Sequence, residues 1–201
     1  MKSRWIHCCS GLLVLLMGSM GAWSDFDRHS VQGPSPLVVL ETSRGDIVIE
    51  LFPDKSPKTV ANFLNLVQSG FCDEMLFHRV VNDIVIQVGL LSMDGEVRGM
   101  EVQPIENESR NRLTNRRGTL GMAREGNPES ATTEFFINVQ DNPEFDYVRF
   151  PRRRWGFAVF GRVIDGMAVV DAIADIPTKR LGPFPNFPSD PVAVYRAYVR
   201  K

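Results

Sequence analysis

The sequence predicts a mainly β protein, a closed eight-stranded antiparallel barrel capped by two α-helices. Three observations support this fold class. About eight short runs of β-branched and aromatic residues are separated by turns. The 13 prolines and 16 glycines are spread along the chain, which favours turns and short strands over long helices. The strands do not alternate regularly with helices and no segment repeats, so an antiparallel barrel is favoured over a parallel sheet.

Length and charge narrow the class further. A chain of 201 residues indicates one main domain, and a hydrophobic content of 43% can fill a sizeable core. The formal net charge of −1 gives no general attraction to nucleic acid or to an anionic membrane. The sequence has neither the Gly-x-Ser-x-Gly motif of serine hydrolases nor a P-loop.

Residues 1–24 have the layout of a secretory signal. Lys2 and Arg4 form a basic start, residues 11–17 an apolar core, and Ala22-Trp23-Ser24 a small-x-small exit. The alternative, a membrane anchor, would need an apolar run of about 20 residues, and the run at 11–17 is far shorter. We therefore expect cleavage before Asp25 and export, to the periplasm if the source is a Gram-negative bacterium. The mature chain would then hold an irregular leader over residues 25–36, a folded domain over 37–201 and no membrane segment.

Cysteine and histidine are scarce in the expected mature chain. Cys8 and Cys9 leave with the signal, so Cys72 cannot form an intramolecular disulfide and is expected to be a small buried residue. His29 and His78 are too few for a histidine-based zinc site. We expect no metal and no cofactor.

The first expected elements are a hairpin and a helix. Residues 37–42 and 47–52 are two strands joined by a short turn. A helix follows, with Ser56 as its cap, Pro57 at its first position and Gly70 at its end. Its apolar residues recur with the spacing of a helix that packs by one face: Val60, Phe63, Leu64 and Val67.

The central element is a second hairpin, with strands at residues 77–81 and 84–88 and a tight turn at Asn82-Asp83. Side chains alternate between the two faces of each strand. Arg79 and Gln87 are the polar interruptions of these otherwise apolar strands. An arginine here either pairs at a sheet edge or faces a ligand.

The rest of the chain adds four strands and a short helix. The strands are expected at residues 118–123, 133–139, 157–164 and 192–199. The helix is expected at residues 167–176, where Pro177 stops it. The connections at 90–117, 124–132 and 140–156 are expected to be loops, and so is the proline-rich stretch after Pro177.

An ordered set of motifs resembles the cyclophilins, and the bacterial exported type most closely. The motifs are Phe77-His78-Arg79-Val80-Val81, Ile86-Gln87, Ile105-Glu106-Asn107-Glu108, Arg117 to Arg124, Ser130-Ala131-Thr132 to Asn138, and Phe157 to Val163. The likeness spans about Leu37 to Val199. It implies an eight-stranded barrel and peptidyl-prolyl cis-trans isomerase activity without a cofactor, acting on X–Pro bonds of exported proteins during folding. The expected partners are proline-containing unfolded or partly folded polypeptides, and the protein is expected to be a monomer.

The resemblance also implies roles for individual residues. Arg79 would be the catalytic arginine, which stabilises the twisted amide, and Gln87 would hold the substrate backbone. The substrate-binding residues would be Ile84, Val85, Ala123, Arg124, Glu134, Phe136, Phe145 and Phe157. Some of them have simpler alternatives: Phe136 as core, Phe145 as a loop anchor, and Arg124 as a solvated charge. His78 resembles a family histidine that packs inside the fold, and we leave it out of the site.

Several positions depart from the family pattern. The family has an aromatic residue at Ile84 and Glu144, glutamine at Glu134, leucine at Phe145, histidine or tyrosine at Phe157, and glycine at Val88. The pocket stays apolar but loses an aromatic wall at Ile84. We expect the carboxylate of Glu134 to reach Arg79 and to pair with it.

Two alternative functions remain open from the sequence. One is a proline-peptide binding module or holdase with weak or vestigial isomerase activity, which an assay on an X–Pro peptide would separate from an active enzyme. The other is a polyanion-binding protein that uses the basic loop Arg149, Arg152, Arg153 and Arg154. Salt-sensitive retention on heparin would support it.

Overall fold

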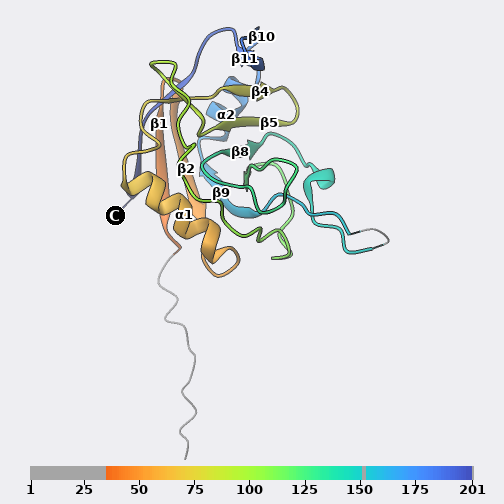
Figure 1. Cartoon of the computed structure of the whole chain (residues 1–201). Helices are drawn as coiled ribbons and strands as arrows, with labels where there is room; N and C mark the ends of the chain where they lie inside the picture. The colour runs from red at the N-terminus through yellow and green to blue at the C-terminus, as the bar shows by residue number, and fades with distance from the viewer. Residues whose placement is uncertain (1–34, 151–152, 201) are drawn as a thin grey trace, which may run out of the picture. The chain divides into compact units, whose positions relative to one another are not determined.

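The computed structural model describes residues 35–150 and 153–200. The expected signal peptide and most of the expected leader lie outside these residues. Ten strands form one antiparallel sheet: β1 (Leu37–Thr42), β2 (Gly45–Leu51), β3 (Met75–Leu76), β4 (Arg79–Val81), β5 (Val85–Val88), β6 (Leu91–Ser92), β7 (Thr119–Met122), β8 (Phe135–Asn138), β9 (Val159–Asp165) and β12 (Ala193–Arg200). Figure 1 shows this sheet curled around the core of the domain. The mainly β class is therefore confirmed.

The closed eight-stranded barrel is not matched in detail. The strands pair in the open order β4-β5-β8-β7-β9-β2-β1-β12-β3-β6, in which β4 and β6 are the two ends. The physical reason is a break in the central hairpin. Only two residues separate β3 from β4 and β5 from β6, yet β4–β5 pairs onto β8 while β3–β6 pairs onto β12. The short strands β3 and β6 lie just outside the two expected strands of the central hairpin and raise the number from eight to ten, and β6 falls in the stretch at 90–117 that we expected to be a loop.

The unbroken part of the central hairpin forms as predicted. Arg79 lies opposite Gln87 and Val81 opposite Val85. The turn is closed by a hydrogen bond of 3.0 Å from the Ile84 N–H to the Val81 carbonyl, and Asp83 takes the positive φ of 57° that such a turn requires.

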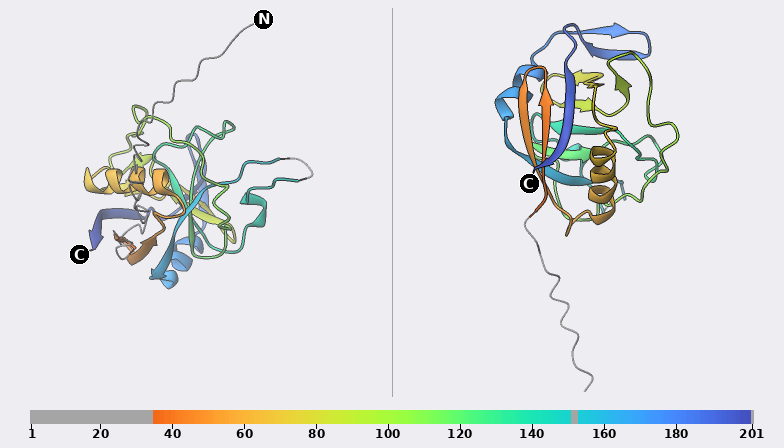
Figure 2. Two further views of the ribbon diagram at one scale, coloured as in Figure 1. Left: turned by 90° about the horizontal axis from the view of Figure 1, so that it is seen from below. Right: turned by 90° about the vertical axis from the view of Figure 1, so that its left-hand side faces the viewer.

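Two α-helices contribute buried residues to the same main core and lie well apart from each other in Figures 1 and 2. The first, α1 (Pro57–Gln68), begins after Ser56 as expected. The Ser56 side chain does not cap the helix, because its Oγ donates to the Val159 carbonyl at 2.8 Å. The second, α2 (Met167–Ala174), ends two residues earlier than expected. Among the described residues no helix is long and apolar enough to cross a membrane.

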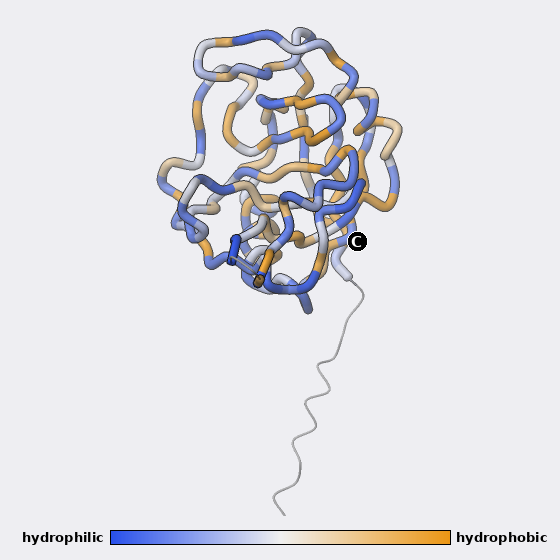
Figure 3. The backbone as a smooth tube through the Cα atoms, turned by 90° about the vertical axis from the view of Figure 1, so that its right-hand side faces the viewer, coloured by the Kyte–Doolittle hydropathy of each residue, from blue (hydrophilic) through white to orange (hydrophobic). Residues whose placement is uncertain are grey.

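The sheet separates the core from a second face. One row across four strands, Val80, Ile86, Ile137 and Leu120, is fully buried in the main hydrophobic cluster. This cluster includes Phe63 of α1, whose ring centroid lies 5.0 Å from that of Phe135. Figure 3 shows hydrophobic stretches running through the interior of the domain and hydrophilic stretches along much of its outside. Because side chains alternate along a strand, the residues beside this row face the other way.

The proline-rich stretch after Pro177 is not the loop that we expected. It contains a hairpin of two strands, β10 (Thr178–Leu181) and β11 (Phe184–Pro188), that is separate from the main sheet. Prolines lack the N–H that a ladder needs, but a two-stranded hairpin has a free edge on each strand where a missing donor costs little. Phe187 is buried, and β11 packs against β4, which carries Arg79.

Cys72 is a buried thiol in the main core, 4% exposed. Burial raises the pKa of this thiol to about 12, and the neighbouring Asp73 contributes in the same direction. The expectation of a small buried residue is confirmed.

Candidate active site

Paired positions on four neighbouring strands form one row on the face opposite the core. Arg79 on β4 lies opposite Gln87 on β5, Gln87 opposite Phe136 on β8, and Phe136 opposite Gly121 on β7. Residues that pair directly in an antiparallel sheet share a face. A Cβ at Gly121 would lie 2.2 Å from Cζ of Phe136, so glycine leaves the space that the ring occupies. The row therefore places a guanidinium, an amide and an aromatic ring in sequence.

The polar half of this site is a chain of hydrogen bonds. Nη1 of Arg79 donates to Oε1 of Gln87 at 3.1 Å. Nε2 of Gln87 in turn donates to Oε2 of Glu134 at 2.6 Å. Gly89 lets the two strands approach at this point, since a Cβ there would lie 2.4 Å from the Thr133 carbonyl oxygen and its φ is 107°.

The direct pair between Glu134 and Arg79 that we expected is not formed. Among the described residues, the ion-pair contact of Glu134 within 4 Å is with His78, and its other side-chain hydrogen bond is with Gln87. The physical reason is that Gln87 lies between the two charges and hydrogen-bonds to both of them. Arg79 and Glu134 interact through their charges alone.

The environment shifts the pKa of both charged groups. Burial lowers the pKa of Arg79, although the charge of Glu134 opposes this, and a guanidinium stays protonated all the same. Burial raises the pKa of Glu134, but hydrogen bonds with His78 and Gln87 and the charge of Arg79 outweigh it. The pKa of Glu134 consequently lies below its ordinary value of 4.5, and the carboxylate is ionised at neutral pH.

His78 is buried inside the fold, as the resemblance implied, with 4% of its side chain exposed. Its Nε2 nevertheless lies 3.1 Å from Oε2 of Glu134, so it belongs to the polar network from which we excluded it. The ring packs edge-on against Phe184 of β11 at 5.7 Å. The Nδ1 atom has no hydrogen-bond partner among the described residues. His78 therefore positions the carboxylate of Glu134 from the buried side of the site.

The apolar half of the site is a small cluster separate from the main core. Val85, Ala123 and Phe136 are buried in it, and Ile84, Phe145 and Phe157 pack around them. The three phenylalanine rings pack edge to face, with centroids 5.7 Å apart for Phe136–Phe145, 5.4 Å for Phe136–Phe157 and 5.1 Å for Phe145–Phe157. Edge-to-face pairs of this kind are favourable and rigid. The arrangement makes an apolar, half-open surface beside Gln87.

Arg124 is not a freely solvated charge. Its Nη2 donates to the Trp155 carbonyl at 2.7 Å and its Nε to the Gly156 carbonyl at 3.2 Å. The guanidinium carbon lies 4.9 Å from the centre of the Phe157 ring. Burial lowers the pKa of Arg124. Arg124 thus fastens the loop before β9 to the apolar cluster.

The structure brings the ten predicted site residues together: three lie in the polar chain, six in the apolar cluster, and Arg124 stacks on Phe157 of that cluster. Sequence reasoning missed Gly121 and a group of asparagines beneath the loop that carries Phe145. Nδ2 of Asn142 donates to the Ile84 carbonyl at 3.0 Å and to Oδ1 of Asn138 at 2.7 Å. An asparagine inside the strand at Asn138 was the available signal, because a buried amide needs partners. Within residues 35–150 and 153–200, no three metal-binding side chains come together.

Comparison with known proteins places this site in a family. The family model described as "Cyclophilin type peptidyl-prolyl cis-trans isomerase/CLD" matches residues 37–199. The chain is 44% identical over 158 residues to peptidyl-prolyl cis-trans isomerase B of Escherichia coli (strain K12), covering 79% of this chain and 96% of the relative. It is 42% identical over 164 residues to peptidyl-prolyl cis-trans isomerase A of Dickeya dadantii (strain 3937), covering 82% and 84%.

Solved structures agree on the fold. Two crystal structures of a cyclophilin type peptidyl-prolyl cis-trans isomerase from Cryptosporidium parvum align with TM-scores of 0.67 and 0.69 at 24% and 25% identity. The alignments cover 82% and 83% of this chain and 99% and 98% of the relative, and the first structure was determined in the presence of the dipeptide Ala-Pro. The chain therefore belongs to the cyclophilin family and is a peptidyl-prolyl cis-trans isomerase.

Proposed function

We propose that Arg79 catalyses rotation about the X–Pro bond by donating a hydrogen bond to the twisted amide. Resonance gives the C–N bond double-bond character and a barrier of about 18–20 kcal/mol. In the twisted state this resonance is lost, so the prolyl nitrogen becomes pyramidal and basic. A guanidinium that donates to this nitrogen binds the twisted state more tightly than the planar one, which is what lowers the barrier.

The hydrogen-bond chain supports this role. Within the part of the chain that the structure describes, one N–H of Arg79 is occupied by Oε1 of Gln87, which leaves four of the five guanidinium donors for a substrate. Gln87 is itself fixed by Glu134, so the guanidinium is held in place before substrate binds. Preorganised donors of this kind need no reorganisation at the moment of reaction.

The phenylalanine cluster is the proposed proline pocket. The proline ring must stay still while the other side of the bond turns, and an apolar surface of rigid rings can hold it. Phe136 connects the two halves, because it belongs to the cluster and pairs with Gln87 in the sheet. This juxtaposition of a guanidinium and an apolar pocket is the single observation that carries the proposal.

The substrates in this proposal are proline-containing segments of exported polypeptides during folding. The signal-like layout of residues 1–24 supports export, and the protein would act as a monomer without a cofactor. Ala123 and Arg124 would bind the residues ahead of the proline, with Arg124 also fixing the loop next to Phe157.

An isomerisation assay on a short X–Pro peptide tests the role of Arg79. Arg79→Ala should lower kcat/KM about tenfold to a thousandfold, as loss of one preorganised donor does. Arg79→Lys should restore little, because an ammonium lacks the planar fork of the guanidinium. Arg196→Ala removes an exposed arginine of β12 and is the matched control. Turnover unchanged in Arg79→Ala would overturn the proposal, and peptide binding without turnover in the parent would indicate a holdase.

A further inference from the structure

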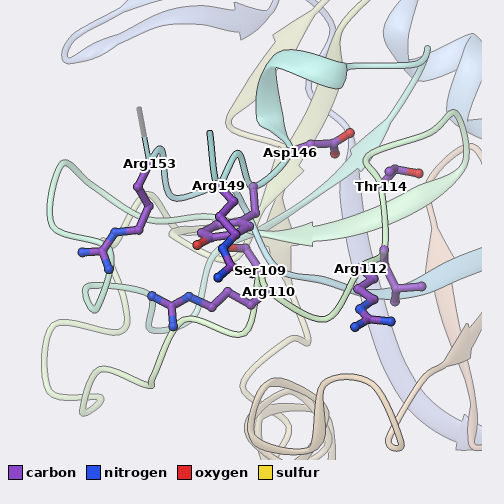
Figure 4. Close-up of a pocket in the computed structure, with 9 residues that line it drawn as sticks. Ser109, Arg110, Arg112, Thr114, Asp146, Arg149 and Arg153 are labelled. Atoms are coloured by element: carbon purple, nitrogen blue, oxygen red, sulfur yellow. The ribbon is translucent and has the colours of Figure 1, made fainter. Parts of the chain in front are cut away.

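A basic pocket lies outside the phenylalanine cluster. It has a volume of about 750 Å³ and is lined by Ser109, Arg110, Arg112, Leu113, Thr114, Asp146, Tyr147, Arg149 and Arg153. Figure 4 shows that Arg110 and Arg112 come from one segment of the chain and Arg149 and Arg153 from another. We define these lining residues as the basic pocket. Its size is within the range of ligand-binding sites.

The charges of the basic pocket are not balanced from within. Four arginines face a single carboxylate, Asp146, whose Oδ1 accepts hydrogen bonds from the backbone and side chain of Asn115 at 2.7 and 3.0 Å. Among the described residues, none of the four guanidinium groups forms an ion pair within 4 Å. A concave surface lined by one sign of charge concentrates oppositely charged ligands.

Ser109 provides a second and independent sign of a ligand. The residue is only 3% exposed, it lines the basic pocket, and its Oγ has no hydrogen-bond partner among the described residues. Buried hydroxyl groups are nearly always hydrogen-bonded. A carboxylate oxygen in the pocket would accept the proton of this hydroxyl.

A chain of contacts through Trp155 links the basic pocket to the proposed proline pocket. The guanidinium carbon of Arg110 lies 4.3 Å from the centre of the Trp155 ring. The carbonyl of the same residue accepts the hydrogen bond of Arg124, which stacks on Phe157 of the phenylalanine cluster. We take these contacts as the direction in which a polypeptide bound in the proline pocket would extend toward the arginines.

We propose that the basic pocket is an accessory substrate subsite that binds acidic side chains flanking the X–Pro bond. Arginine suits this ligand because its fork matches both oxygens of a carboxylate. The inference rests on the proposed function, since it assumes that the substrate lies in the proline pocket. It selects acidic polypeptides among the proline-containing substrates.

A peptide is favoured over an extended polyanion by the shape of the surface. Four arginines, Arg110, Arg112, Arg149 and Arg153, line one cavity, and among the described residues no further basic side chain of its lining extends them into a longer basic track. Of the basic loop named from the sequence, Arg149 and Arg153 line this cavity. Arg154 instead donates to the carbonyls of Pro143 and Asp146 at 3.5 Å, and Arg152 lies outside the described residues.

The test compares two Ala-Pro peptides that differ in one flanking triplet, three glutamates or three glutamines. The triplet is placed ahead of the proline in one pair and after it in another. At an ionic strength of about 0.02 M, we expect the KM of the acidic peptide to be about threefold to tenfold lower in at least one pair, with kcat unchanged. The preference should shrink at about 0.3 M salt, because exposed charges are then screened.

Variants assign the preference to the basic pocket. Arg112→Gln/Arg149→Gln should abolish it while the neutral peptide keeps its kcat/KM within about twofold. The control Arg196→Gln/Arg200→Gln removes two exposed arginines of β12 and should keep it. Ser109→Ala should weaken the preference without lowering Tm, because the Oγ has no protein partner to lose.

Binding of the same peptides carrying a fluorescent label, followed by anisotropy, gives the same comparison without turnover. A failure of the proposed catalytic role, seen as no turnover of the neutral peptide, is therefore distinguishable from a failure of the subsite. Equal affinity for acidic and neutral peptides at low salt in both placements would overturn the inference. Heparin retention that depends on Arg112 and Arg149, without any peptide preference, would overturn it in favour of a polyanion site.

Discussion

Replacing Glu134 by glutamine should raise isomerase activity. The carboxylate neutralises part of the positive charge of Arg79, which the twisted amide uses, and it repels the lone pair that develops on the prolyl nitrogen. Glutamine keeps an oxygen that can accept from Gln87 and His78, so the hydrogen-bond chain survives while the negative charge is lost. The substitution therefore removes the negative charge near Arg79 and leaves the hydrogen bonds in place.

The structure gives the size of this effect. The carboxylate lies one amide group beyond the guanidinium, through hydrogen bonds of 3.1 and 2.6 Å. This path puts the two charged groups about 8 Å apart, and the prolyl nitrogen would lie one further hydrogen bond away, about 11 Å from the carboxylate. Two unit charges at that distance interact by about 1.5 kcal/mol at an effective dielectric of about 20, so about a third of a unit charge on the nitrogen would be disfavoured by about 0.5 kcal/mol. Removing the carboxylate should raise kcat/KM about twofold.

The assay is kcat/KM on a neutral X–Pro peptide at pH 7 and low salt, with Tm as the check on folding. Glu129→Gln removes an exposed carboxylate in a loop and is the matched control for net charge. A fall in kcat/KM for Glu134→Gln would refute the electrostatic reasoning and show that the ionised carboxylate orients Gln87 and Arg79. An unchanged value would show that the charge is screened from the reacting bond.

Three further predictions follow from other features. Gly121→Ala should destabilise the fold by about 1–3 kcal/mol and raise KM, because the new methyl group meets the Phe136 ring; Gly126→Ala, with no atom within 4 Å of its Cβ, is the control for thermal unfolding and kinetics. Since the folded pKa of Glu134 is lowered, its charge stabilises the fold above the ordinary value of 4.5, and this stability is lost as pH falls through the folded pKa; Tm of the parent should therefore drop more than that of Glu134→Gln in acid. Intact mass of protein from the cell envelope should place the mature N-terminus at Asp25, and full-length chain in the cytosol would contradict export.

Local patterns predicted most elements of the fold but missed the short strands β3 and β6 beside the central hairpin. The spacing of apolar residues and the proline at position 57 located α1, and alternation located the strand pair of Arg79 and Gln87. The break between β5 and β6 depends on how Gly89 approaches the Thr133 carbonyl, a contact between segments far apart in sequence. The β10–β11 hairpin was missed because prolines argue against strands, whereas its stability comes from packing of β11 against β4.

The resemblance predicted which residues form the site, but not the hydrogen bonds that connect them. The residue types at Arg79, Gln87 and Phe136 fitted the family, and the register of three strands confirms that they share a face. The sequence could not show that Gln87 would lie between Arg79 and Glu134. It also could not show that His78 would contact Glu134 from the buried side, because that contact depends on side-chain direction at two distant positions.

The buried thiol of Cys72 has a chemical consequence for an enzyme that works among unfolded chains. Disulfide exchange proceeds through the thiolate, and a pKa of about 12 leaves this thiol protonated at physiological pH. Unfolded chains that carry reactive cysteines would form mixed disulfides with an accessible thiolate. Enclosed in the core at 4% exposure, Cys72 is shielded from such cysteines and from oxidants as long as the domain stays folded. Alkylation of Cys72 therefore reports global opening of the domain.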